Sequence, residues 1–590
     1  MKKLILYLFV ILTLSGYGQK GMISAADLKR DVTFLASDSL KGRKSGTPEI
    51  NVAGSYILNR FLEAGLIPLG ENGFQYFEIV TNVTLGSGNY LEFSSGSFSI
   101  KEDFVPLSFS TNGTVKAPVI FAGFGFDLNL DSLKWNDYQQ MDVTGTWVMV
   151  FRGDPEPDLS DSKFIPFSDI RTKILTAKDK GAAGVLLITP KSVDKEDKLM
   201  PLIVENNEVT SGIPVINIRR DLADRLLGKK GSTDSLEKAI IRDKMPHSFT
   251  TSIILNGATD VVQHRERTFN VIALLPGRDS ILRDEYLVVG AHYDHLGLGG
   301  PGSGSRMPDT NAVHNGADDN ASGTALIMEL ADLLSQESKK VRRSIIFIAF
   351  SGEEIGLLGS KFFVNHPAVP LSKIKGMFNF DMVGRFDPEK NSISVSGTGT
   401  SVEADTILRI YESSLPFKVI HAPDGYGPSD HAAFYAAGIP VFYFNTGVHI
   451  DYHTPFDDTE KLDFKTEAEI GDFAASVIRE VDGMNQSLAF RESGKRDGTG
   501  RGGRRLKVTL GIMPDFAGTE KKGLRVDGVT KEGPADKGGM RKGDIIISVN
   551  GMKVENIYEY MSRLQKLRQG QTISVEVIRE EKIVVLIIQL

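Results

Sequence analysis

The chain has 590 residues, of which 41% are hydrophobic and 24% charged, and its formal net charge is −7 at pH 7. One hydrophobic core rarely serves more than about 250 to 300 residues, so several domains are expected. The negative charge gives no electrostatic reason to expect DNA or RNA as a partner. The sequence contains no cysteine, which excludes disulfides, thiolate metal sites and lipid-modified cysteine anchors.

The N-terminal residues have the layout of a secretory signal peptide. Lys2 and Lys3 precede an apolar run over residues 4–14, and small and polar residues follow over 15–19. The run is shorter than the about 20 residues that span a bilayer, and a buried helix would not explain the paired lysines. We therefore predict a signal peptide over residues 1–18 and export to a bacterial periplasm or medium. No later segment is apolar enough for an integral membrane helix after cleavage.

Two helices are expected next, over residues 28–35 and 49–64, joined by the turn-rich segment SLKGRKSG at 39–46. From about residue 75 to 256 the sequence changes to short β-type runs separated by glycine and asparagine. Few candidate ligands stand at strand ends there. We predict a β-rich domain, residues 106–257, inserted into an enzyme.

The inserted section resembles protease-associated (PA) domains. The resemblance rests on its texture, on the helix-like run at 174–180 and on the following GAAGVLLIT at 181–189. It implies a lid or a substrate-recruiting module without chemistry of its own.

From residue 268 strands alternate with helices until about 484, and residues 464–481 carry apolar side chains at helical spacing. The predicted catalytic domain thus comprises residues 25–105 and 258–485. Its expected fold class is α/β, with a mixed, mainly parallel sheet flanked by helices. Residues 491–504 are rich in glycine and positive charge and lack apolar side chains, which favours a flexible linker, residues 486–504, over a nucleic-acid or lipid-binding arm.

Residues 505–590 read as a small, β-rich domain. The phrases LGIM at 510–513, GPADKGGM at 533–540, KGDII at 542–546 and VNG at 549–551 closely resemble a PDZ domain. The resemblance implies a groove in which a C-terminal peptide adds as a strand. The backbone N–H groups of Leu510, Gly511 and Ile512 would hold its carboxylate. A groove that is empty, or filled by the protein's own chain, fits the sequence as well.

Histidines and carboxylates gather where predicted strands end. His292 and Asp294 follow the apolar run 286–289, and in extended geometry their side chains point the same way. Asp294 is then placed to accept the second ring N–H of His292, the arrangement that orients metal-bound histidines. Taken alone, this spacing is a weak metal signal.

The other candidates strengthen the signal. Asp318 and Asp319 lie in GADDNASG at 316–323, at the start of a helix, where a single aspartate would usually be a cap. Glu353 and Glu354 follow a strand that is expected to be buried on both faces. Two adjacent carboxylates there repel each other, which favours a bound cation. For a Glu-Glu pair in isolation, a solvated loop is the simpler interpretation. Asp381 ends the next strand, and His453 follows the run 441–444.

These nitrogen and oxygen donors suit zinc, and two neighbouring zinc ions need a carboxylate shared between them. The order of AHYD at 291–294, GADDN at 316–320, GEE at 352–354, FDM at 380–382 and YHT at 452–454 resembles the co-catalytic zinc aminopeptidases related to bacterial leucyl aminopeptidase. Glutamate carboxypeptidase and the glutaminyl cyclases belong to the wider family.

The resemblance implies two zinc ions per chain and a role for each matched residue. His292 and Asp381 would bind one ion, Glu354 and His453 the other, and Asp319 would bridge them. Glu353 would be the general base that accepts a proton from a metal-bridging water, and Asp294 would orient His292.

All matched positions keep competent residue types, which argues against an inert relative and against the cyclase branch. The sequence therefore predicts an exported di-zinc exopeptidase that removes N-terminal residues from peptides. Two alternatives stay open: a carboxypeptidase or amidohydrolase on the same metals, and a catalytically inert peptide-binding protein that uses the PA and PDZ modules. The sequence does not indicate which substrate side chain is preferred or which ligand the PDZ domain binds. Further polar residues are candidates for substrate contact or for bracing the pocket: His295, His314, Arg385, His431, His449 and Tyr452.

Overall fold

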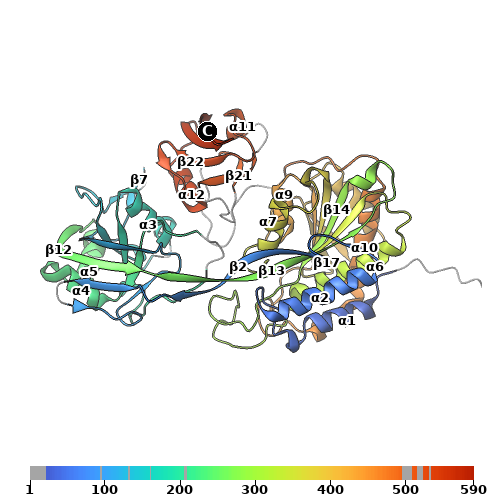
Figure 1. Cartoon of the computed structure of the whole chain (residues 1–590), viewed down its shortest axis with the longest axis horizontal. Coiled ribbons are helices and arrows are strands. Elements are labelled where there is room, and N and C mark those ends of the chain that lie inside the picture. Colours follow the sequence, from blue (N-terminus) through green and yellow to red (C-terminus); the bar gives the residue numbers. More distant parts are fainter. Residues whose placement is uncertain are drawn as a thin grey trace, which may run out of the picture.

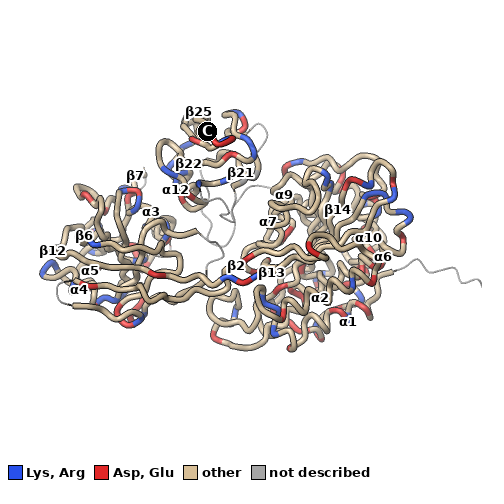
Figure 2. Tube along the Cα trace, viewed as in Figure 1, with Lys and Arg blue, Asp and Glu red and all other residues tan. Residues whose placement is uncertain are grey.

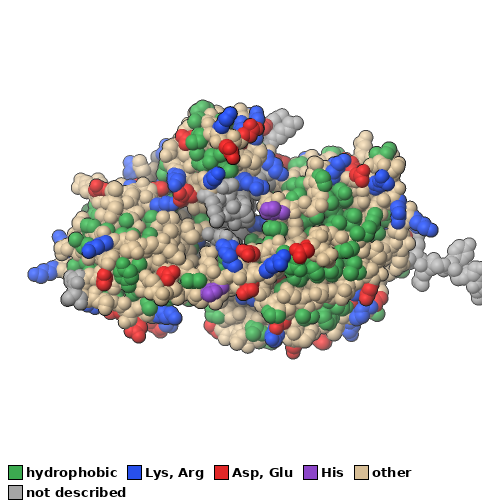
Figure 3. All heavy atoms as spheres, viewed as in Figure 1, with side chains coloured by type: hydrophobic (Ala, Val, Ile, Leu, Met, Phe, Trp, Pro, Cys, Tyr) green, Lys and Arg blue, Asp and Glu red, His purple; other side chains and the backbone are tan. Residues whose placement is uncertain are grey.

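The computed structural model describes residues 22–93, 96–130, 133–159, 161–204, 209–493, 508–514, 522–529 and 533–590. The predicted signal peptide and residues 494–504 of the predicted linker lie outside this part. Three lobes are visible in Figures 1 and 3: an α/β lobe, a second lobe and a small C-terminal lobe beside them. In Figure 1 the second lobe lies at the far end of a long two-stranded ribbon.

The α/β lobe is built on a nine-stranded sheet with the order β1-β13-β15-β14-β16-β19-β17-β18, in which β2 also pairs with β13. Its centre, from β15 to β19, is parallel, whereas β13 and β17 run antiparallel to their inner neighbours. This mixed sheet confirms the predicted fold class. The strand bounds are β1 (Ile67–Pro68), β2 (Phe74–Leu85), β13 (Val261–Leu275), β14 (Tyr286–His292), β15 (Ser344–Phe350), β16 (Ile374–Phe380), β17 (Ser392–Ser396), β18 (Lys418–Ala422) and β19 (Val441–Asn445).

Helices cover both faces of this sheet. Leu287 and Val289 on β14 pack into a core that also holds apolar side chains of α1, α2, α6 and α10, whereas Val288 packs with Phe363 and Phe434 of α7 and α9. Burial on both faces explains the unbroken apolar runs that the sequence shows for these strands. The helix bounds are α1 (Ala25–Leu35), α2 (Pro48–Glu63), α6 (Gly323–Gln336), α7 (Leu358–Asn365), α8 (Ala404–Glu412), α9 (His431–Ala436) and α10 (Phe464–Gly483).

The second lobe is the inserted domain, and β2 and β13 form the ribbon that carries it (Figure 1). Its eight-stranded sheet has the order β4-β3-β12-β6-β9-β10-β11-β5 and begins at Tyr90, earlier than the predicted boundary at 106. The elements are β3 (Tyr90–Phe93), β4 (Gly96–Ser97), β5 (Phe104–Pro106), β6 (Gly113–Phe121), β7 (Asp127–Leu130), β8 (Leu133–Asn136), β9 (Trp147–Phe151), α3 (Ile170–Asp179), β10 (Gly184–Ile188), β11 (Val215–Ile218), α4 (Arg220–Leu227), α5 (Thr233–Asp243) and β12 (Phe249–Thr259).

The C-terminal lobe is a small β domain with the sheet order β20-β21-β22-β24-β25. Its helix α12 lies against α3 of the inserted domain. Lys178 Nζ is 2.6 Å from Glu555 Oε2 and 2.8 Å from Glu559 Oε1, and Arg563 pairs with Asp179. The elements are β20 (Ile512–Pro514), β21 (Leu524–Val529), α11 (Pro534–Lys537), β22 (Ile545–Val549), β23 (Met552–Lys553), α12 (Ile557–Gln565), β24 (Thr572–Arg579) and β25 (Lys582–Gln589).

Residues 486–493, the first part of the predicted linker, lie against the α/β lobe. Leu488 is buried in its core, Arg491 N donates to Thr400 O, and Ser493 N donates to Tyr435 Oη. Acidic and basic residues alternate over all three lobes, as Figure 2 shows, so none of them carries a face of one sign in this view. Within the described residues, no helix is long and apolar enough to cross a membrane.

Candidate metal centre

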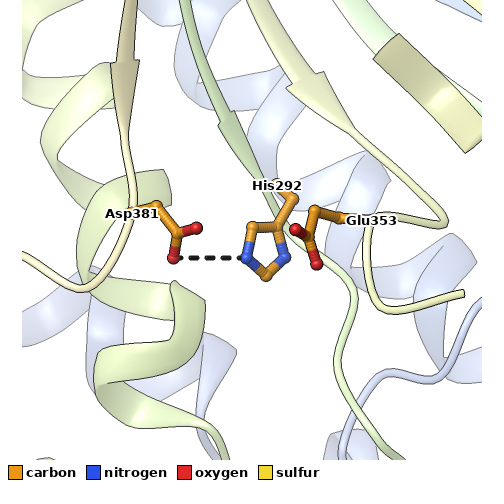
Figure 4. Close-up of side chains that lie close together, drawn as sticks. All are labelled: His292, Glu353 and Asp381. Atoms are coloured by element: carbon orange, nitrogen blue, oxygen red, sulfur yellow. Dashed lines mark ion pairs between the residues drawn. The ribbon is translucent and has the colours of Figure 1, made fainter. Parts of the chain in front are cut away.

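The carboxyl ends of the parallel strands bring the predicted ligands together. His292 is the last residue of β14, Asp381 directly follows β16, and Glu353 stands three residues after β15. Figure 4 shows the His292 ring between the carboxyl groups of Asp381 and Glu353. Since β14 neighbours both β15 and β16, these three side chains reach one place although almost ninety residues separate His292 from Asp381.

Asp319 lies between two histidines. Its Oδ1 is 3.3 Å from His292 Nε2, and its Oδ2 is 3.1 Å from His453 Nε2. On the first side Asp381 Oδ1 is 3.4 Å from His292 Nε2, and on the second Glu354 Oε2 is 3.1 Å from His453 Nε2. The structure thus arranges the five predicted ligands as two sets that share one aspartate.

The charges of these groups are strongly coupled. Burial raises the pKa of Asp319, but hydrogen bonds from His292 and His453 outweigh it and hold that pKa well below its usual range. Burial likewise lowers the pKa of His453, and the Glu354 and Asp319 carboxylates raise it to about 11. Desolvation, with Glu354 and Asp381 nearby, raises the pKa of Glu353 well above its usual value. The carboxylates therefore stabilise a positive charge, such as that of protonated His453, on the groups beside them.

The donor set fits a metal. Asp381 Oδ1 is buried and has no hydrogen-bond partner. A buried carboxylate oxygen without a partner is costly, and a bound cation would remove this cost. Among the described residues, the groups able to hold an ion with donor atoms within 4.8 Å of one another are His292, Glu353 and Asp381, and His295, Asp319 and Glu354. These sets differ from the predicted pairing, because the first contains Glu353 in place of Asp319 and the second contains His295 in place of His453.

His295 was expected only as a possible substrate contact. Its Nδ1 is 2.7 Å from Glu354 Oε1, and its Nε2 is buried without a partner. A histidine that hydrogen-bonds a ligating carboxylate fixes its orientation, so His295 supports Glu354 at the second position.

Asp294 differs in detail from the sequence-based expectation. The acceptor nearest to His292 Nδ1 is the backbone oxygen of Asp294 at 3.2 Å, whereas its Oδ1 is 3.7 Å away. The carboxylate is turned because Oδ1 accepts the N–H of Glu353 and Oδ2 accepts the hydroxyl of Ser45. Asp294 thus lies beside His292, as predicted, and holds the backbone of Glu353 as well.

Other supporting residues escaped the sequence analysis. The buried Arg43 donates to the backbone oxygens of Tyr293, Gly316 and Asp319 and so joins the two loops that carry ligands. Asp457 Oδ2 accepts the N–H of Asp319 at 3.0 Å. Neither contact could be read from spacing, because each joins distant parts of the chain.

The predicted carboxylate-binding loop of the C-terminal domain lies just before β20. Leu510 is buried, and its backbone oxygen accepts the N–H of Ala535. Gly511 has a φ of +73°, which favours glycine, and its N–H donates to Thr509 Oγ1. Ile512 begins β20 and pairs with Val529. One of the three predicted carboxylate donors is therefore held inside the loop.

Imidazoles and carboxylates at the carboxyl edge of a parallel sheet, with a glutamate beside them, define a metal-dependent hydrolase site. Residues 270–478 match the model of peptidase family M28, and residues 508–590 match the PDZ domain. The first match confirms the resemblance to the co-catalytic aminopeptidases over residues 270–478, and the second confirms the C-terminal PDZ domain. Both the site and the match support a metallopeptidase.

The chain is similar to known aminopeptidases. It is 26% identical to Aminopeptidase YwaD of Bacillus subtilis over 373 residues, 62% of this chain and 67% of that protein. It is 30% identical to a probable leucine aminopeptidase of Arthroderma benhamiae over 211 residues, 34% of this chain and 52% of that protein. The chain thus spans about half to two thirds of these relatives. A solved zinc aminopeptidase from Bacillus subtilis superposes with a TM-score of 0.45 and 21% identity, over 78% of this chain and 96% of that chain.

Proposed function

We propose that this protein is an exported zinc aminopeptidase that removes N-terminal residues from peptides. The observation that carries the proposal is the position of Asp319, whose two oxygens face His292 and His453 separately. The names of its relatives, which include aminopeptidases and a zinc enzyme, support the activity and the metal.

In this proposal each metal position has its own donors. His292 and Asp381 would hold one zinc ion, Glu354 and His453 would hold the other, and Asp319 would serve both, which makes two ions per chain. Zinc held by these residues would supply a Lewis acid, which lowers the pKa of water and polarises a carbonyl group. His295 and Asp294 keep the donors in place through their contacts with Glu354 and His292.

Glu353 is the proposed general base. Its carboxyl group lies beside the His292 ring, on the side away from Asp381 (Figure 4), and burial raises its pKa, which makes it a stronger base than an exposed glutamate. It would take a proton from the attacking water and pass it to the leaving amine. Glu353→Gln should retain the metal and lose turnover by at least about 10²-fold. A variant with wild-type kcat would exclude this role.

The charge of the site favours an amine over a carboxylate as the bound end of the substrate. Among the described residues, no Lys or Arg nitrogen lies within ion-pair distance of the carboxyl groups of Asp319, Glu353, Glu354 or Asp381. A C-terminal carboxylate would therefore find no basic side chain beside these groups with which to pair.

A carboxypeptidase is the second candidate, because Arg385 follows the Asp381 strand and its Nη1 is buried without a hydrogen-bond partner. Its Nη2, however, is 3.1 Å from Asp451 Oδ2, so part of its charge is already matched. A free C-terminal carboxylate would have to use the remaining donor.

Reporter substrates separate the two candidates. We expect hydrolysis of aminoacyl amides with a free α-amine, loss of that hydrolysis with a chelator, and its return with zinc. Cleavage confined to N-blocked or C-terminal reporters would reject the aminopeptidase and favour the second candidate.

The accessory parts have proposed roles of their own. The paired lysines and apolar run at the N-terminus support export to the periplasm or medium. The inserted domain is proposed to be of the PA type and to border the site. Its Ile203 lies close to Gly302, and Gly304 of the same loop accepts a hydrogen bond from His453. The PDZ domain is proposed to bind C-terminal peptides.

A further inference from the structure

A chain of buried hydroxyl groups ends at Asp294. Thr268 Oγ1 is 2.7 Å from Ser351 Oγ, Ser351 Oγ is 2.8 Å from Ser45 Oγ, and Ser45 Oγ is 3.0 Å from Asp294 Oδ2. The exposed fractions are 0% for Thr268 and Ser351, 3% for Ser45 and 1% for Asp294. The four residues come from three distant parts of the chain, since 306 positions separate Ser45 from Ser351.

The carboxylate at one end fixes the direction of these hydrogen bonds. An ionised carboxylate only accepts, so Ser45 donates its single proton to Asp294. Ser351 must then donate to Ser45, and Thr268 must donate to Ser351. Hydrogen bonds that run in one direction polarise and strengthen one another.

The chain also fixes the backbone that leads to Glu353. Ser45 Oγ accepts the N–H of Gly352 at 2.9 Å, and Asp294 Oδ1 accepts the N–H of Glu353 at 3.1 Å. The N–H groups of Gly352 and Glu353 are thus held by Ser45 and by Asp294, and Ser45 in turn donates to Asp294. A side chain whose backbone is held on two sides keeps its place with little reorganisation.

We propose that Ser45 is a positioning residue for hydrolysis, which holds Asp294 and the Gly352–Glu353 backbone so that the Glu353 carboxylate stays beside the metal ligands. This inference rests on the proposed role of Glu353 as general base. Ser45 lies between α1 and α2, before the inserted domain and outside residues 270–478 that match the family model. Arg43, two positions earlier, holds the ligand loops from the same segment.

Ser45→Ala in the full-length, zinc-loaded enzyme tests the proposal. We expect kcat to fall about 10- to 100-fold, as for other groups that orient ligands or bases, while KM changes by less than about threefold. Thr268→Val, further from Asp294, should lower kcat less, and Thr268→Ser, which keeps the hydroxyl, should restore it. Ser39→Ala is the matched control, because Ser39 Oγ bonds only the exposed Ser37 Oγ in the same segment.

A second readout does not depend on turnover. In the metal-free protein, Ser45→Ala removes the acceptor of the Gly352 N–H, so hydrogen exchange over residues 345–358 should accelerate, and Ser39→Ala should leave it unchanged. The melting temperature of Ser45→Ala should stay within about 4 °C of wild type. Unchanged exchange, or a kcat loss that appears only together with general destabilisation, would overturn the positioning role.

Glu353→Gln separates this inference from the proposed function. If Glu353→Gln is inactive while Ser45→Ala keeps wild-type kcat, the positioning role alone is overturned. If Glu353→Gln keeps wild-type kcat, the base assignment fails and the inference about Ser45 fails with it.

Discussion

Two clusters of buried carboxylates in the α/β lobe differ in what neutralises them. The helix cluster, formed by Asp31, Glu329 and Asp332 with Arg30 and Arg60, lies between α1, α2 and α6. Arg60 Nη2 is 2.9 Å from both Glu329 Oε1 and Asp332 Oδ2, and Arg30 Nε is 2.9 Å from Asp31 Oδ1. Arginines of the chain thus pair with each of the three carboxylates.

The ligand cluster, formed by His292, Asp319, Glu353, Glu354, Asp381 and His453, has no such arginines. In the described part of the chain only histidines lie within ion-pair distance of its carboxylates. A histidine gives up its proton when it binds a metal, so a metal ion can replace these protons as the positive charge beside the carboxylates. The comparison indicates that the helix cluster serves folding and that the ligand cluster serves a metal.

The largest expected effect comes from the shared aspartate. Asp319→Asn should lower the bound zinc and reduce kcat/KM by at least about 10³-fold, because it removes charge from both positions. Zinc content and hydrolysis of an aminoacyl amide measure the effect. Asp332→Asn, a matched change in the helix cluster, should leave both unchanged, and equal losses in the two variants would remove the distinction between the clusters.

The next effect concerns stability. Arg60→Leu should destabilise the fold by about 2 to 4 kcal/mol, because the buried carboxylates of Asp31 and Glu329 lose a positively charged partner. Chemical denaturation measures it, and added zinc should not restore the loss. Below the melting transition kcat should match wild type. A variant that zinc rescues would show that the helix cluster, too, responds to metal.

The smallest effect is a pH dependence in the helix cluster. Burial, with Asp27 and other acids nearby, raises the pKa of Glu329 from 4.5 to about 7. Between these values the folded state holds more protons than the unfolded state, so stability falls as pH rises through this window. The advantage of Glu329→Gln over wild type should thus grow by about 1 to 3 kcal/mol from pH 4.5 to 7 and then level off. Equal advantages at pH 5 and pH 8 would contradict the shift.

The sequence predicts where half of the ligand cluster lies, because His292, Glu353 and Asp381 end or closely follow strands. The unbroken apolar runs before His292, Glu353 and Asp381 place all three at one sheet edge, and the structure brings them together there. The mixed α/β fold follows from the same alternation of strands and helices. Two domain boundaries differ from the prediction: the inserted sheet begins earlier, at Tyr90, and residues 486–493 of the predicted linker pack against the α/β lobe.

The supporting residues could not be predicted in this way. Arg43 and Ser45 lie in a turn-rich segment where serine, glycine and basic residues are ordinary, and their partners are more than 240 positions away. Their roles depend on tertiary contacts that no local pattern encodes. The turned carboxylate of Asp294 has the same origin, since Ser45 and the Glu353 amide compete with His292 for its oxygens.

The number of zinc ions bound per chain tests the central claim most directly. Metal analysis of the full-length protein, stripped by a chelator and then dialysed against excess zinc, should give two ions per chain, with aminopeptidase activity that returns in parallel. Fewer than about one ion per chain would contradict the claim that the ligand cluster is a two-metal site.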